Sequence, residues 1–171
     1  MKRSKKYRPK FGNTADMAER IGARLDRIAS SALPLDASAP AALELKMIQA
    51  VSGMTSGQGM IEHAITLASE ISLGIVLCEA NFANSREYIG LVVSARDALE
   101  SAGERHVRTG VWGLSGPERT ALNEFIELRV AQLSDDRNTQ GIERAANERV
   151  LVDIEAGNFV RFTGEREACA A

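Results

Sequence analysis

The chain has 171 residues, of which 44% are hydrophobic and 26% are charged, and its formal net charge is -2. This length suits a single domain with a sizeable core, and the composition excludes general disorder and collagen. With only two cysteines, Cys78 and Cys169, a disulfide framework is also excluded. The most apolar run, residues 71–78, is too short to cross a bilayer. We therefore expect a cytoplasmic protein without a membrane partner.

The near-neutral charge hides a strong asymmetry along the chain. Residues 1–10 contain six cations and no acid. The rest of the chain then has 21 − 6 = 15 basic against 23 acidic residues, a net charge of -8. The sequence predicts a flexible basic arm over residues 1–12 and one acidic helical domain over residues 13–171.

Helical spacing of apolar residues starts directly after the arm. A first helix is expected over residues 14–28, capped by Thr14, with Met17, Ile21, Leu25 and Ile28 on one face. Pro34 and Pro40 bracket a loop over residues 32–39. A second helix follows and ends in a glycine-rich turn over residues 52–59. Its apolar face consists of Leu43, Met47, Ala50, Val51 and Met54.

Residues 60–82 form the most apolar helical pattern of the chain. Leu67, Val76 and Leu77 make it apolar on several sides, as expected of a helix in the middle of a bundle. A strand over residues 73–77 is the alternative. The main stripe of this helix consists of Ile61, Ala64, Ile65, Ala68, Ile71, Ile75, Cys78 and Phe82.

Three more helices are expected before the C-terminal tail. The first is capped by Asn84 or Ser85, ends at Gly103 and leads to a glycine-punctuated connection over residues 110–116. Ser115 and Glu118 then have the spacing of a capping box, and residues 134–136 end the helix that follows. Gly157 ends the last one. The expected core positions of these helices are Tyr88, Val92, Ala95, Leu99 and Ala102, then Leu122, Phe125, Ile126, Val130 and Leu133, and finally Ile142, Ala146, Val150, Leu151 and Ile154.

Few aromatic residues, many alanines and repeated spacings of three and four residues predict an all-α fold. The expected architecture is a compact bundle of five to six helices that carries the basic arm.

Signals of catalysis are weak, so we expect no enzyme activity, cofactor or metal. His63 and His106 are the only histidines, and neither has the spacing of a helical metal site. A zinc site would have to recruit His63, Cys78, His106 and a carboxylate from separate elements. Gly57 and Gly59 match neither a P-loop nor a dinucleotide fingerprint. A triad assembled in space stays open, because its members need not be close in sequence.

The basic arm is the most specific local feature. Its cations could neutralise phosphates while the ring of Tyr7 stacks on a base, or they could bind an acidic protein surface, or only keep the terminus solvated. The acidic domain confines any nucleic-acid contact to the arm and to Arg105, His106 and Arg108. The candidate partner-binding residues of the arm are Lys2, Arg3, Lys5, Lys6, Tyr7, Arg8 and Lys10.

Trp112 is a further candidate partner-binding residue. It is the only tryptophan of the chain and lies in a glycine-rich connection, away from any helical stripe. A large ring at such a place either covers one end of the bundle or anchors an interface.

Two stretches carry a resemblance to a protein family. The basic start KRSKKYRPK, together with REYIG, ARDAL and ALNE within residues 85–133, resembles short uncharacterised proteobacterial proteins of prophages and mobile elements. The resemblance covers roughly a third of the chain and implies no catalytic residues. It implies an accessory protein that binds a host machine, as inhibitors of bacterial defence of the anti-CRISPR type do.

Two functions therefore remain in view. The first is a non-catalytic phage or mobile-element protein that binds a host protein or ribonucleoprotein, with an acidic face that imitates a nucleic-acid backbone. The alternative is a DNA- or RNA-binding module that acts through the arm. The apolar stripes also leave a homodimer possible.

Overall fold

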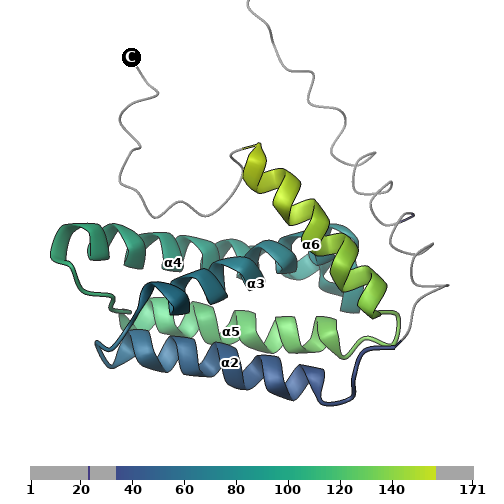
Figure 1. Ribbon diagram of the computed structural model, residues 1–171, viewed down its shortest axis with the longest axis horizontal. Helices are drawn as coiled ribbons and strands as arrows, with labels where there is room; N and C mark the ends of the chain where they lie inside the picture. The colour runs from purple at the N-terminus through teal and green to yellow at the C-terminus, as the bar shows by residue number, and fades with distance from the viewer. Residues whose placement is uncertain (1–22, 24–33, 157–171) are drawn as a thin grey trace, which may run out of the picture.

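The computed structural model describes residue 23 and residues 34–156 of the chain (Figure 1). The predicted basic arm and the predicted C-terminal tail lie outside these residues, as does the predicted helix over residues 14–28 apart from residue 23. The described part contains five α-helices, and a 3-10 helix, η1 (Phe82–Tyr88), precedes the third of them. The α-helices are α2 (Ala39–Thr55), α3 (Ile61–Glu79), α4 (Ile89–Thr109), α5 (Gly116–Leu133) and α6 (Gln140–Glu155). The prediction of an all-α bundle of five to six helices is confirmed.

Four of these helices form an up-and-down bundle. Short connections join α2, α3, α4 and α5 in turn, so that consecutive helices run in opposite directions, and α5 closes the ring by packing against α2 (Figure 1). Helix α6 crosses α3 obliquely and shares backbone contacts with no other described helix. Its N-terminus is joined to the start of the described chain, because Pro34 forms an isolated bridge with Thr139.

The core follows most of the predicted stripes. Helix α3 lies between the others, as its many-sided apolar pattern predicted, and the alternative of a strand over residues 73–77 is wrong. At Gly74, α3 approaches α5 and α4 closely, since a Cβ there would lie 2.7 Å from Cε2 of Phe125 on α5 and 3.6 Å from Cγ1 of Val92 on α4. A second, smaller cluster joins α3, η1 and α6 around Phe82 and Ile142.

Several predicted boundaries and core positions are wrong. Neither Asn84 nor Ser85 caps a helix: both lie inside η1, and the Ser85 hydroxyl accepts a hydrogen bond from Gln132 in the interior. Gly103 does not end its helix, because it is buried in the packing of α4, which continues to Gly110 in the left-handed conformation (φ 74°). Apolar positions that were expected in the core but are exposed are Ile61, Ile65, Tyr88, Leu151 and Ile154.

Helix α3 is the one described helix that is long and apolar enough to cross a membrane. Half of it is buried inside the bundle, and the core helix of a soluble protein has the same length and composition. This is weak evidence of a membrane span.

Candidate protein-interaction surface

Of the predicted partner-binding residues, the structure describes only Trp112, and those of the basic arm lie outside it. The Trp112 side chain is 4% exposed. Its ring stacks on the imidazole of His106 with centroids 4.3 Å apart and planes 8° apart. A Cβ on Gly59 would lie only 2.4 Å from Cβ of Trp112, so the α2–α3 turn rests directly on this residue. This position agrees with the role of covering one end of the bundle.

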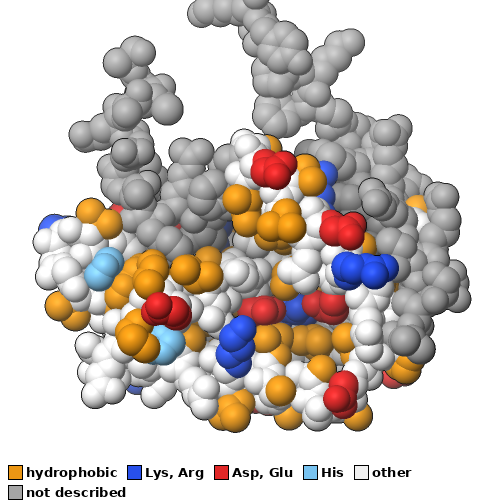
Figure 2. Space-filling model, in the orientation of Figure 1, with side chains coloured by type: hydrophobic (Ala, Val, Ile, Leu, Met, Phe, Trp, Pro, Cys, Tyr) orange, Lys and Arg blue, Asp and Glu red, His pale blue; other side chains and the backbone are white. Residues whose placement is uncertain are grey.

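Large apolar side chains are exposed around this covered end. Met60, Ile61 and Ile65 belong to the α2–α3 turn and the start of α3, while Val107 and Val111 belong to the end of α4 and the residue after its cap. Their exposed fractions range from 45% to 61%. Figure 2 shows hydrophobic side chains gathered over the ends of α3 and α4. We call these five residues the end patch.

The antiparallel register brings the two halves of the end patch together. Gly74 of α3 faces Val92 of α4. Counting thirteen residues back from Gly74 and thirteen forward from Val92 places Ile61 level with Arg105, so that Val107 lies half a turn beyond it. Contiguous apolar patches of this kind are typical of protein-interaction sites.

The charges around the end patch are mostly acidic. Glu62 and Glu104 are exposed beside it, and Figure 2 shows an acidic side chain among the hydrophobic ones. The charge of Arg105 is balanced within the chain, because its guanidinium forms a bidentate pair with Glu118 at 2.6 and 3.1 Å. Residues 34–156 as a whole carry ten basic and eighteen acidic side chains, a net charge of -8.

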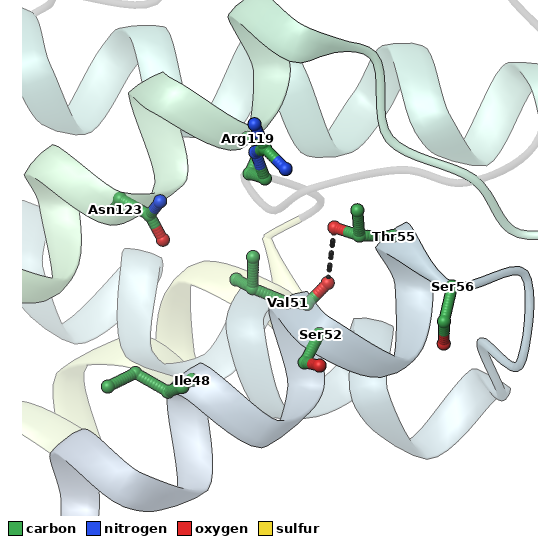
Figure 3. A pocket seen from close by; sticks show the side chains of 7 residues that line it. All are labelled: Ile48, Val51, Ser52, Thr55, Ser56, Arg119 and Asn123. Atoms are coloured by element: carbon green, nitrogen blue, oxygen red, sulfur yellow. Dashed lines mark hydrogen bonds between the residues drawn. The ribbon is translucent and has the colours of Figure 1, made fainter.

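A shallow hollow of about 300 Å³ lies between α2 and α5 (Figure 3). Arg119 and Asn123 line it from α5, and Ile48, Val51, Ser52, Thr55 and Ser56 line it from α2 and its C-cap. The Thr55 hydroxyl donates to the Val51 carbonyl at 2.7 Å and is thereby occupied. No carboxylate, histidine or cysteine lines the hollow, so its serine hydroxyls have no general base beside them.

A buried polar cluster joins α3, α5 and α6. The Arg129 guanidinium is 1% exposed and donates to Glu70 at 3.0 Å and to both oxygens of Glu143 at 3.2 and 2.7 Å. Burial opposes the charge of this guanidinium, but the two carboxylates outweigh it and raise the pKa of Arg129. Asn138 donates to Glu143 at 2.7 Å, which completes the tie between α5 and the start of α6.

This cluster was missed in the sequence, although a signal for it is present. Arg129 lies three residues after Ile126 and four before Leu133, on the buried face of α5. A charged residue at such a position needs a buried partner of opposite charge. Sequence alone does not say which of the many carboxylates supplies it.

The candidate zinc ligands are not brought together. His63 packs against Gly53 near the start of α3, and its Nδ1 accepts from the Met60 amide at 3.2 Å. Cys78 lies fifteen residues further along the same helix, about 22 Å away. There it contacts Gln132, and burial raises the pKa of its thiol. No group of three or more histidine, cysteine or acidic side chains within the described residues could hold a metal ion.

Comparisons with known proteins yield no match: no family model, no curated protein and no solved structure matches this chain. A functional proposal therefore rests on the surface and charge of the molecule.

Proposed function

We propose that this chain is a non-catalytic interaction protein that binds a host protein or ribonucleoprotein through the end patch and the acidic surface around it. The observation that supports this most is the exposed apolar end patch on a bundle whose described residues carry a net charge of -8. Aliphatic side chains would supply the apolar area of the contact, and the acidic surface would select a basic partner.

Within this proposal, the setting of a phage or mobile element comes from the resemblance of the sequence. An acidic protein can occupy a basic channel that normally holds nucleic acid, which is one physical route to inhibition of a host defence complex. Inhibition of the anti-CRISPR type is the specific form of this proposal. The cytoplasm is where such a partner would be met.

The experiment is affinity capture from a bacterial lysate, with and without nuclease. Two variants make it specific. Ile65→Glu changes the end patch, and Leu45→Glu introduces the same charge on α2. The two wild-type side chains are similarly exposed, Ile65 at 53% and Leu45 at 57%. We expect a partner that is lost with Ile65→Glu and kept with Leu45→Glu. Equal capture by both variants would refute binding through the end patch.

The alternative is nucleic-acid binding through the basic arm, and the six cations of residues 1–10 favour it. Deletion of residues 1–10 separates the two functions. A contact made by the body survives the deletion, whereas nucleic-acid binding by the arm is abolished. Measuring nucleic-acid affinity in increasing salt then reports how many phosphates are neutralised.

A further inference from the structure

The end patch has a shape that selects a particular kind of partner segment. Ile61 and Ile65 lie one turn apart on the same face of α3. Val107 lies on the neighbouring, antiparallel α4, so the apolar side chains stand in two rows at the distance of packed helices, about 8–10 Å. A third helix can place its apolar side chains between two such rows.

The charges beside these rows are arranged along the same direction. Glu62 is exposed on the outer side of Ile65, and Glu104 is exposed one turn before Val107 on α4. Arg108 is the exposed cation nearest in sequence, but it points about 100° away from Val107 around the helix axis. A segment that lies between the rows therefore has carboxylates along both of its edges.

We propose that the end patch binds an amphipathic helix of the partner whose apolar face is flanked by lysine or arginine. This inference rests on the proposed function and adds the chemistry of the partner segment. Apolar side chains along one face of that helix pack in turn against Val107, Ile61 and Ile65, which follow one another in this order along the axis of α3. Its flanking cations meet Glu62 and Glu104, which sets the orientation of the helix in the contact.

The probe for this proposal is a fluorescently labelled 18-residue peptide of leucine and lysine whose leucines follow helical spacing. A peptide of the same composition in scrambled order has the same charge and no apolar face. Anisotropy titrations measure the affinity of both for the full chain and for Ile65→Glu and Leu45→Glu. Circular dichroism checks that both variants keep the wild-type helix content.

The two variants separate specific binding from general attraction between opposite charges. Both add one negative charge, so general attraction would make both bind the basic peptide as tightly as the wild type or tighter. The proposal predicts that Ile65→Glu binds the amphipathic peptide at least about tenfold more weakly, because the contact loses a buried aliphatic side chain. This tenfold loss corresponds to about 1.4 kcal/mol. The proposal also predicts that the affinity of Leu45→Glu stays within about twofold of the wild type, because Leu45 lies outside the end patch.

Three results would overturn the proposal. One is no binding of the amphipathic peptide, or equal binding of the scrambled peptide. Another is equal affinity of the two variants for the amphipathic peptide. The last is a wild-type dimer in sedimentation that Ile65→Glu converts to a monomer, because a second copy then covers the end patch. If lysate capture still depends on Ile65 while the peptide fails to bind, the proposed function stands and only this inference falls.

Discussion

Replacing Arg129 by methionine is expected to cost about 3–5 kcal/mol of the free energy of unfolding. Methionine fits the aliphatic part of the site, so the loss comes from charge rather than from a cavity. Glu70 and Glu143 both contact the 1% exposed guanidinium and are themselves only 13% and 16% exposed. Without Arg129 two largely buried carboxylates face each other unpaired, and breaking a buried ion pair in this way has a cost of about 3–5 kcal/mol.

The loss should be visible both globally and in α6. For a chain of this size each kcal/mol lowers the melting temperature by roughly 2–4 °C, so the expected decrease is about 6–20 °C. Calorimetry and urea unfolding measure it. Among the described helices, α6 shares backbone contacts with α3 alone. Arg129 ties the first turns of α6 to α5 through Glu143. Amide hydrogen exchange should therefore accelerate in α6 more than in α2.

A triple variant provides the control for this reasoning. Combining Arg129→Met with Glu70→Gln and Glu143→Gln removes the unpaired charges and should recover most of the lost stability. A loss below about 1 kcal/mol for the single substitution would contradict the assigned role of the cluster. So would a triple variant that is no more stable than Arg129→Met alone.

Three further predictions follow from local contacts. Gly59→Ala should destabilise the fold by about 1–3 kcal/mol and change the fluorescence of Trp112, because the new Cβ would lie 2.4 Å from Cβ of that residue. The control Gly90→Ala meets nothing within 4 Å and should be neutral or stabilising. Burial raises the pKa of Glu118, but hydrogen bonds from its paired arginine and from the cap serine outweigh it and hold the pKa below its ordinary 4.5. This contribution is lost as the pH falls through the folded-state pKa, so Glu118→Gln should flatten the dependence of stability on pH below about 4.5 in urea unfolding at several pH values. In a chain whose other cysteine is serine, Cys78 should react with a thiol reagent only after denaturant is added, because it is buried and its pKa is raised.

The helices were predictable because their local signals agree with their packing. Ser115 accepts from the Glu118 amide while Glu118 accepts from the Ser115 amide, which is the predicted capping box. Met47, Ala50, Val51 and Met54 are all buried, as their spacing on α2 indicated. Where the capping residues and the spacing of apolar residues indicate the same helix, the local preference of the sequence agrees with the tertiary packing, and the helix forms as predicted.

The errors occurred where a tertiary contact decides the outcome. Ser85 has the side chain of a helix cap, but Gln132, 47 residues away, donates to its hydroxyl instead. Gly103 resembles a helix stop, but packing buries it inside α4. Ile61 and Ile65 belong to an apolar pattern that continues beyond the point where other helices cover α3. The end patch is therefore visible only when the register of α3 against α4 is known.

The ion pairs of the described residues leave the acidic excess of the body in place. Arg96, Arg105, Arg129, Arg137 and Arg149 are each held by carboxylates of the same chain. These five are half of the ten cations in residues 34–156, and they engage six of the eighteen acids. These pairs hold five positive and six negative charges, so the excess of eight negative charges in residues 34–156 falls only to seven when they are set aside. A partner of the body therefore meets a surface with a net excess of negative charge, and its affinity should fall as salt screens that surface.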